Sequence, residues 1–356
     1  FSQRMTDDTL QISTVNVSAK SEIRNFALLK KNIDSMSISN NVHTDISEVL
    51  HKNTPVFVKQ SVRGSKAGLS LRGAGTSHTK VLWNKIPLNS PMHGSMDLSL
   101  LPFFFADNIS ILSSASSVTQ SDGALGGTLQ LKTTPEWNKG FNLDYTGAAG
   151  SFHTFDNFLK INYSTSKISS STRLFHSSSE NDFKFENNDI INGGTSVREN
   201  ADFTNYGMLQ SFIFRPVSNQ FLSFNIWAQK SERGVPGLST NESGFRNNKS
   251  RQKDENLNAI LSWKIKKSKI SFNTWTAANL QKNNFSTQNY ISGTGYYKSI
   301  KSVSSSFASF SGVKSSTEIN SKHKLSACIR YHYYHVKSHE QVRDNKYDAE
   351  RGEIYE

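Results

Sequence analysis

NISILSSASSVTQSDGALGGTLQLKT, residues 108–133, is the stretch that divides the chain into two unlike parts. Two short runs of β-strand composition, Ile109–Leu112 and Thr128–Leu131, flank a loop of small residues. The loop contains Asp122-Gly123, a step that supplies the positive φ of a tight turn, and Gly126-Gly127, which lets backbones approach closely. The sequence before this stretch predicts a compact mixed domain. The sequence after it predicts long strands that alternate polar and apolar residues.

The sequence before residue 134 carries one helix signal and several short strand signals. Asp45 and Glu48 match a capping box, so we expect a helix that starts at Ile46 and is stopped by Asn53–Pro55. Short strands separated by Gly, Ser and Lys turns are expected at residues 56–58, 69–73 and 81–83. One helix with several short strands predicts a small α/β or α+β domain.

Nine longer strands are predicted after residue 135. They are residues 141–150, 157–166, 168–178, 205–215, 220–230, 255–266, 268–280, 299–313 and 322–337. In the strand predicted at residues 255–266, one face is apolar and is predicted to contact lipid: Leu257, Ala259, Leu261 and Trp263. The other face is polar and is predicted to line a water-filled lumen: Asn256, Asn258 and Ser262. This alternation alone fits one face of a soluble β-sandwich nearly as well.

The lengths of the connections separate these two alternatives. Very short turns are expected at residues 166–167, 217–219 and 266–267, and long polar connections rich in Asn and Gly at residues 179–204, 231–254 and 281–298. Short turns at one end and long loops at the other are typical of outer-membrane barrels. The connections therefore favour a membrane barrel over a sandwich.

The composition argues against several other classes of protein. The chain has 356 residues and a formal net charge of +12. Hydrophobic residues make up 35% of the chain, and aromatic residues make up 11% of it. The 41 Lys and Arg residues are scattered and accompany no nucleic-acid-binding motif, so no nucleic-acid partner is expected. No stretch approaches the ~20 apolar residues of a membrane-spanning helix.

No chemistry of catalysis or metal binding is predicted. The sequence contains no phosphate-binding loop, nucleophile elbow or zinc-protease pair, so we expect neither an enzyme nor a cofactor. The single Cys328 excludes internal disulfides and Cys-rich zinc sites. His332, His335 and His339 raise the possibility of a metal site, but a solvated strand end rich in Tyr and His is favoured.

The order of the short motifs resembles that of the plug domain of TonB-dependent outer-membrane receptors. Within that family it is most similar to the cobalamin-receptor-like branch. The motifs, in chain order, are Val15–Ala19, Asp45–Leu50, Leu71-Arg72-Gly73, Val81–Leu88, Asp97–Pro102, Ile109–Leu112 and Gly123–Thr133. The Arg233–Gly237 element at the start of a long connection is also similar to this family, although by itself it is an ordinary β-turn. The chain has Asn84-Lys85 where the family usually has Asp-Gly, and Ser113-Ser114-Ala115 where it usually has Arg-Gly-Pro.

The resemblance implies an N-terminal α+β plug domain followed by an antiparallel transmembrane β-barrel. Residues 1–13 would be a flexible segment, 14–134 the plug, and 135–356 the N-terminal portion of the barrel. The plug motifs would be Leu71, Arg72, Gly73, Asp122, Gly123, Gly126 and Gly127. A TonB-box-like strand, which pairs with a TonB-type energy-transducing protein of the inner membrane, would be formed by Thr14, Val15, Asn16, Val17, Ser18 and Ala19.

The function implied by the resemblance is energised uptake of a scarce nutrient chelate, cobalamin or a ferric siderophore, across the outer membrane of a Gram-negative bacterium. The alternative is a surface-exposed or secreted β-rich binding protein without transport. The motif order before the strands favours the receptor, because an adhesin has no need of a plug. The barrel is expected to be incomplete in this chain, since plugged outer-membrane transporters have about 22 strands and nine are predicted.

Overall fold

The computed structural model describes residues 30–33, 46–54, 56–112, 124–187, 194–237, 250–291, 296–320, 323–348 and 353–355. Segments 1–13 and Thr14–Ala19, together with Asp45 and Asp122-Gly123, lie outside these ranges. Within the described residues, no helix has the length and apolar character that a membrane crossing requires.

The N-terminal part is built on a five-stranded sheet in the order β1-β6-β7-β4-β5. Its strands are β1 (Lys30–Ile33), β4 (Thr79–Trp83), β5 (Ile86–Pro87), β6 (Asn108–Leu112) and β7 (Gly127–Lys132). Strands β4 and β7 run parallel, and the other neighbours are antiparallel. Around the sheet lie helix α2 (Ile46–Asn53), the hairpin of β2 (Phe57–Lys59) and β3 (Gly68–Ser70), and the 3-10 helices η1 (Thr76–His78), η2 (Leu98–Leu100) and η3 (Phe103–Phe105). The predicted α+β domain is confirmed.

Helix α2 forms where the sequence predicts it. Ile46, Val49 and Leu50 lie on one face and are buried, so the helix packs through an apolar stripe. At its C-terminal end, the Thr54 hydroxyl donates to the Leu50 carbonyl at 2.5 Å. The Leu50 carbonyl also accepts the Thr54 N–H at 3.0 Å, so Thr54 closes the helix with two bonds to one of the carbonyls at its end.

The two runs that flank the small-residue loop form the centre of this sheet. Strands β6 and β7 pair antiparallel, with Ile109 opposite Leu131 and Ile111 opposite Leu129. All four side chains lie on one face and are buried, and Ser110 and Gln130 on the opposite face are buried too, so both faces of this part of the sheet are covered. Residues 108–133 therefore place the two central strands of the domain side by side.

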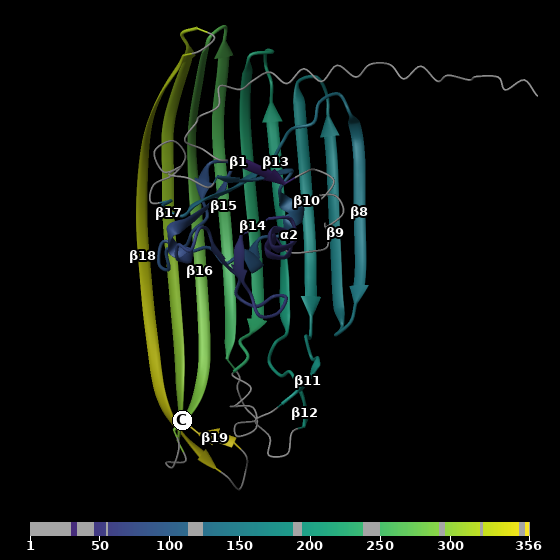
Figure 1. Cartoon of the computed structure of the whole chain (residues 1–356), viewed down its shortest axis with the longest axis vertical. Coiled ribbons are helices and arrows are strands. Elements are labelled where there is room, and N and C mark those ends of the chain that lie inside the picture. The colour runs from purple at the N-terminus through teal and green to yellow at the C-terminus, as the bar shows by residue number, and fades with distance from the viewer. Residues whose placement is uncertain are drawn as a thin grey trace, which may run out of the picture.

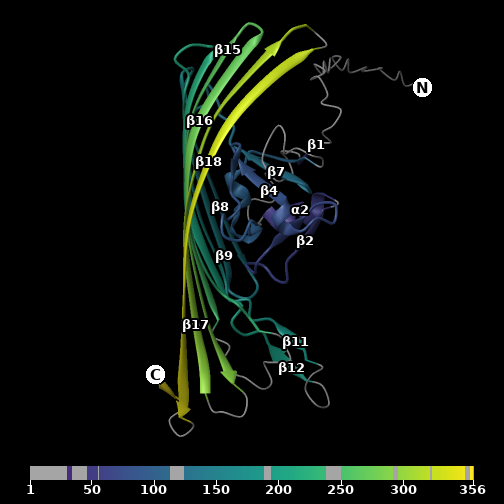
Figure 2. The same ribbon diagram turned by 90° about the vertical axis from the view of Figure 1, so that its left-hand side faces the viewer.

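The C-terminal part is a ten-stranded antiparallel sheet in the order β19-β18-β17-β16-β15-β14-β13-β10-β9-β8. Its strands are β8 (Gly140–Gly150), β9 (Thr154–Ser164), β10 (Ile168–Ser179), β13 (Phe203–Phe214), β14 (Gln220–Gly234), β15 (Arg251–Lys267), β16 (Ile270–Ile291), β17 (Tyr296–Glu318), β18 (Lys324–Asp348) and β19 (Glu353–Tyr355). All nine predicted strands are present, and β11 (Lys184–Glu186) pairs with β12 (Thr195–Val197) in a separate small hairpin. Figure 1 shows the long strands side by side, and Figure 2 shows the plug on the concave side of the curved sheet.

The prediction of a third long connection, at residues 281–298, is wrong. Strand β16 continues to Ile291 and β17 begins at Tyr296, so the two are joined only by residues 292–295. An unbroken antiparallel ladder pairs Gln281 with Ser306 and Ile291 with Tyr296. The Asn, Gln and Ser residues of this region resemble a loop by composition, but ladder hydrogen bonds hold the backbone extended whatever the side chains are.

The other connections follow the predicted asymmetry. The turns β9–β10, β13–β14 and β15–β16 are short, whereas β10 and β13, and β14 and β15, are separated by longer stretches of sequence at the opposite end. Strand β14 runs to Gly234 and β15 starts at Arg251, so the second of these is shorter than predicted. The short-turn end is the periplasmic end in outer-membrane barrels, and the long connections are extracellular.

Side chains alternate between the two faces of β15 as predicted. Leu257, Leu261 and Trp263 are 37%, 45% and 42% exposed on the face away from the plug. Asn258 and Ile260, on the other face, are each 3% exposed because the plug covers that side. The outward side chains form the surface that we expect lipid to cover.

This alternation predicts a large difference between two neighbouring positions. Leu261→Arg should make folding into micelles or bilayers less favourable by about 2–4 kcal/mol, because it places a charge on the lipid-facing surface. Ser262→Arg should cost much less, since the Ser262 side chain points to the opposite face and is partly exposed at this position. Folding yield and heat-induced unfolding measured by electrophoretic mobility would test this. Equal losses for the two variants would contradict the assignment of faces.

Candidate functional site: the plug and its seat on the barrel strands

Two of the predicted plug motifs, far apart in the sequence, pack against each other. Leu71-Arg72-Gly73 forms a turn in which Arg72 and Gly73 have φ values of 56° and 71°. The turn is closed by the Ala74 N–H, which donates to the Leu71 carbonyl at 3.0 Å. Gly126-Gly127 lies against this turn at the start of β7.

The approach of these two motifs requires glycine at both positions of the pair. A Cβ atom on Gly126 would lie 2.8 Å from the Ala74 Cβ and 3.0 Å from the Leu71 carbonyl oxygen. A Cβ on Gly127 would lie 2.5 Å from the Leu112 carbonyl oxygen, and the φ of 141° at Gly127 also disfavours a side chain. The other predicted pair in this loop, Asp122-Gly123, lies outside the described residues.

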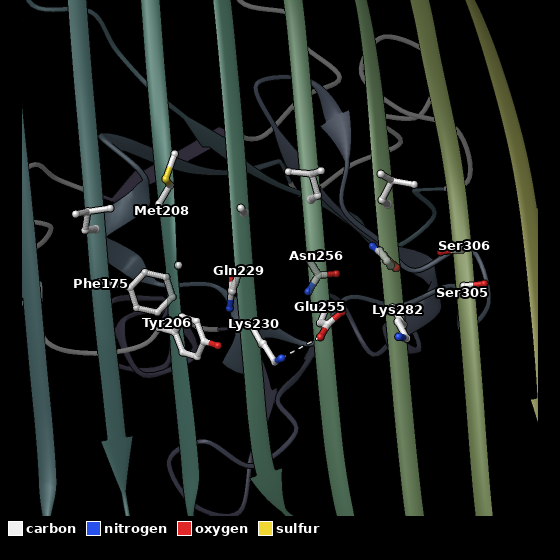
Figure 3. A pocket seen from close by; sticks show the side chains of 16 residues that line it. Phe175, Tyr206, Met208, Gln229, Lys230, Glu255, Asn256, Lys282, Ser305 and Ser306 are labelled. Carbon is white, nitrogen blue, oxygen red and sulfur yellow. Dashed lines mark ion pairs between the residues drawn. The ribbon is translucent and has the colours of Figure 1, made fainter.

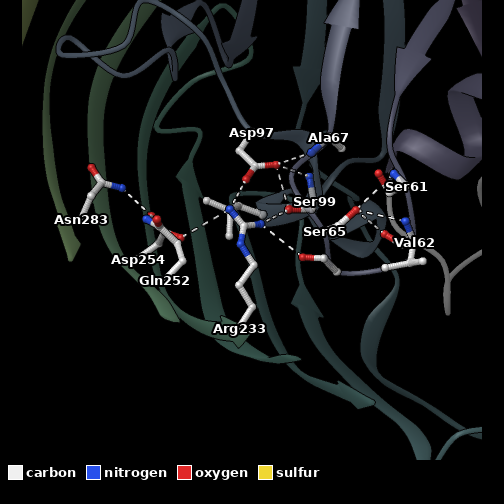
Figure 4. Close-up of polar contacts among 12 residues, drawn as sticks. Ser61, Val62, Ser65, Ala67, Asp97, Ser99, Arg233, Gln252, Asp254 and Asn283 are labelled. Carbon is white, nitrogen blue, oxygen red and sulfur yellow. Dashed lines mark hydrogen bonds and ion pairs between the residues drawn. The ribbon is translucent and has the colours of Figure 1, made fainter. Parts of the chain in front are cut away.

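Arg233 of β14 reaches from the large sheet into the plug (Figure 4). Its guanidinium donates to the Asp97 carboxylate at 2.7 Å, to the Ser99 hydroxyl at 2.8 Å and to the Gly64 carbonyl at 3.2 Å. A second carboxylate, that of Asp254 on β15, lies 4.0 Å away. The Arg233 side chain is only 8% exposed, so water screens these contacts little.

Asp97 also organises the plug around itself. Its carboxylate accepts the Ala67 N–H at 2.8 Å, the Ser99 N–H at 3.1 Å and the Ser99 hydroxyl at 2.8 Å. Because Asp97 caps the 3-10 helix η2 and binds Arg233 at once, the position of this helix depends on the contact with the barrel strand.

Two further arginine–aspartate pairs join the plug to the strands. Arg173 of β10 donates to both carboxylate oxygens of Asp107 at 2.6 Å and to the Phe104 carbonyl at 2.9 Å. In the reverse direction, Arg63 of the plug binds Asp156 of β9 through two bonds of 2.9 and 2.7 Å. The Arg173 and Asp156 side chains are each 3% exposed. Such paired bonds fix orientation as well as charge.

Aromatic side chains fill the interface between these ion pairs. Trp83 and Phe105 of the plug contact Trp227 of β14, with ring centroids 5.5 and 5.4 Å apart. Phe105 also meets Phe175 of β10 at 5.1 Å. The core of the plug therefore continues into the inward face of the large sheet, and the plug is packed on the sheet rather than merely tethered to it.

The same architecture is found in known proteins. The model of the TonB-dependent Receptor Plug Domain matches residues 29–128. The vitamin B12 transporter BtuB of Vibrio vulnificus is 30% identical over 76 residues, which cover 21% of this chain and 12% of the relative. The chain belongs to the TonB-dependent receptors.

Solved structures agree on the fold. The siderophore receptor PiuA from Acinetobacter baumannii aligns with a TM-score of 0.66 at 14% identity over 92% of this chain and 48% of its own. The pyoverdine receptor FpvA from Pseudomonas aeruginosa PAO1 aligns with a TM-score of 0.70 at 10% identity over 88% and 47%. The chain thus spans about half the length of these solved receptors, so it holds the plug and a partial barrel. As a TonB-dependent receptor it is a protein of the outer membrane.

The receptor departs from its family at the β4–β5 turn, where Asn84-Lys85 replaces Asp-Gly. Asn84 and Lys85 have φ values of 46° and 80°, which suit Asn but not Lys. The Asn84 side chain compensates by accepting the Thr133 N–H at 3.1 Å and donating to the Thr133 hydroxyl at 2.5 Å. The Asn84 side chain therefore ties the β4–β5 turn to the residue that follows β7.

Lys85 projects toward the wall of the barrel, where its ammonium lies 5.6 Å from the centroid of the Trp275 ring. The side chain still reaches solvent. Desolvation, followed by repulsion from Lys314 and Lys264, lowers the pKa of Lys85 to about 8. Lys85 therefore loses its charge well below the pH at which an ordinary lysine does.

The histidines of the C-terminal strand do not converge. His332 lies on the inward face of β18, where its ring is 5.2 Å from that of Phe310. His335 and His339 lie an odd number of residues away and so project from the other face of the strand. The three residues cannot bind one metal ion in this arrangement.

Sequence reasoning missed the residues that join the plug to the receptor's strands. The two barrel arginines carried a usable signal: Arg173 and Arg233 occupy inward positions of strands, where a charge needs a partner. Arg233 also begins the element that resembles the family. Asp97 opens one of the motifs that resemble the family, but no local pattern pairs these arginines with Asp97 and Asp107, because the partners lie more than sixty residues away in the chain.

Proposed function

We propose that this receptor imports a scarce nutrient chelate, cobalamin or a ferric siderophore, with energy supplied through a TonB-type protein of the inner membrane. The observation that carries this proposal is the plug seated on the concave face of the sheet by three arginine–aspartate pairs. A plug held in this way blocks passive flow, so a ligand must bind first and the plug must then be rearranged.

Energy would enter at the N-terminal segment. In this proposal Thr14–Ala19 adds as a strand to the edge of a sheet in the TonB-type partner, and main-chain hydrogen bonds supply most of the affinity. The domain limits that accompany it are residues 1–13 as a flexible segment, 14–134 as the plug and 135–356 as part of the barrel. Force on the segment would act on the plug, whose contacts with the strands include the Arg233 network.

The ligand class rests on similarity to proteins whose names state a cargo. BtuB of Vibrio vulnificus is a vitamin B12 transporter, FecA a ferric citrate transporter and PiuA a siderophore receptor. OprC, a copper transporter, shares the fold at a TM-score of 0.57. These cargoes are metal chelates or metal ions, and the partial sequence similarity to BtuB makes cobalamin the first ligand to test.

Transport assays test the proposal. Cells that express the full-length receptor should accumulate radiolabelled cobalamin or a ferric siderophore at nanomolar concentrations. Accumulation should stop when the proton gradient is collapsed or the TonB-type protein is deleted, whereas surface binding should persist. Binding without energy-dependent accumulation for every chelate tried would instead support a surface binding protein without transport.

A further inference from the structure

The outward face of the large sheet carries one polar row directly beside one apolar row. Strand register places eight outward residues in the polar row, in order Asn157, His176, Tyr206, Lys230, Glu255, Lys282, Ser305 and Lys337. Two residues toward the short turns on the strands from β9 to β17 lies the apolar row of Leu159, Leu174, Met208, Ala228, Leu257, Leu280 and Phe307. On β18 the corresponding residue is His335, so the apolar row ends at β17. The outward surface thus changes from polar to apolar over two residues along each of the strands from β9 to β17.

The position of this step matches a membrane boundary. From Lys230 to the periplasmic end of β14 at Gln220 is about ten residues, or roughly 33 Å of strand at ~3.3 Å per residue. With the usual tilt of about 45°, this length spans ~25 Å of membrane, the height of the apolar band of outer-membrane barrels. The polar row therefore lies at the level of the head groups of the outer leaflet.

A depression of about 730 Å³ crosses this boundary. Its apolar part centres on Ala228, whose small side chain lies between the larger Met208 and Leu257 of the neighbouring strands. Lys230 and Lys282 line its polar edge, as Figure 3 shows from the outward side.

The polar edge of the depression has an excess of positive charge. Lys230 forms an exposed ion pair with Glu255 at 3.1 Å. Lys282 is exposed and forms no ion pair with any residue that the structure describes. With Lys337 in the same row, three lysines face one carboxylate, and the charge lies next to an apolar hollow. This combination fits a molecule with an anionic head and acyl chains.

We propose that the depression binds an anionic, phosphate-bearing lipid of the outer leaflet. The phosphate lies against Lys282 and Lys230, and an acyl chain lies over Ala228 between Met208 and Leu257. The lipid is not the cargo: it occupies the outward face of the sheet, on the side opposite the plug. This site goes beyond the proposed transport and does not depend on it.

Binding of bisphosphorylated lipid A to the full-length receptor in uncharged detergent, followed by native mass spectrometry, tests the proposal. Each lysine near an anionic lipid surface contributes about fivefold in affinity, so Lys230→Gln with Lys282→Gln should weaken binding about 25-fold. Enzymatically dephosphorylated lipid A should bind the unaltered receptor equally weakly. Lys267→Gln, outward but at the opposite end of β15, is the matched control and should bind as the unaltered receptor does.

A second variant separates the acyl contact from the charge. Ala228→Phe fills the apolar hollow without altering the charge, and should reduce lipid binding. The heat-sensitive shift in electrophoretic mobility that reports a folded barrel should stay unchanged. The proposal is overturned if the phosphorylated and dephosphorylated lipids bind alike, if the lysine and Ala228 variants bind as the control does, or if a second copy of the receptor rather than lipid covers this face.

Discussion

Replacing Arg233 with Met should weaken the seating of the plug by about 3–5 kcal/mol, because it removes the positive charge from two poorly solvated carboxylates. Asp97 would lose its 2.7 Å bond, and Asp254, only 4% exposed, would lose its nearby cation. Undocking in urea can be followed by tryptophan fluorescence, since Trp83 of the plug contacts Trp227 of the wall. The variant should undock at a clearly lower urea concentration.

Lys230→Met is the matched control for this prediction. It also removes a cation that is paired with a carboxylate on the neighbouring strand, but the pair of Lys230 and Glu255 is 45% and 47% exposed. Exposed pairs contribute only ~0–1 kcal/mol, so the urea midpoint should barely change. Adding Asp97→Asn to Arg233→Met should recover part of the lost stability of plug seating, because it removes one of the two carboxylate charges left without a cation. Equal midpoints for Arg233→Met and Lys230→Met would show that the network does not hold the plug.

Local patterns predicted much of this fold because they depend on neighbours in the chain. The capping pattern and apolar spacing around Ile46 predicted helix α2, and alternation from Leu257 to Trp263 predicted which face of β15 the plug leaves open. Each of these follows from one element meeting one apolar surface. Patterns with periods of two and about four residues are therefore reliable here without any knowledge of distant contacts.

The parts that escaped prediction depend on distant partners. The extension of β16 and β17 beyond Gln281 comes from ladder pairing, to which Asn and Ser side chains contribute no visible pattern. The pairing of Arg173 with Asp107 bridges 66 positions and two domains. The contact of Leu71 with Gly126 and Gly127 could be anticipated only as two motifs of one family, because the steric need for glycine appears once the backbones meet.

The coupling segment gives a second prediction with a large effect. If Thr14–Ala19 is the strand that pairs with the TonB-type protein, its backbone supplies most of the affinity and its side chains supply little. Proline lacks the N–H donor and fixes φ, so Val17→Pro or Val15→Pro in the full-length receptor should abolish energised uptake. Val17→Ala, which keeps the N–H, should be much milder and is the matched control.

The decisive comparison is between binding and accumulation in the same cells. In the proposed function, ligand arrives from outside at the end of the sheet where β10, β13, β14 and β15 meet their long connections, opposite the short turns. Surface binding should therefore survive Val17→Pro while accumulation falls to the level seen without the proton gradient. If the segment were instead an integral strand of the plug, proline would lower folding yield and ligand affinity together. Parallel loss of binding and accumulation would thus assign Thr14–Ala19 to the plug core and remove it from energy coupling.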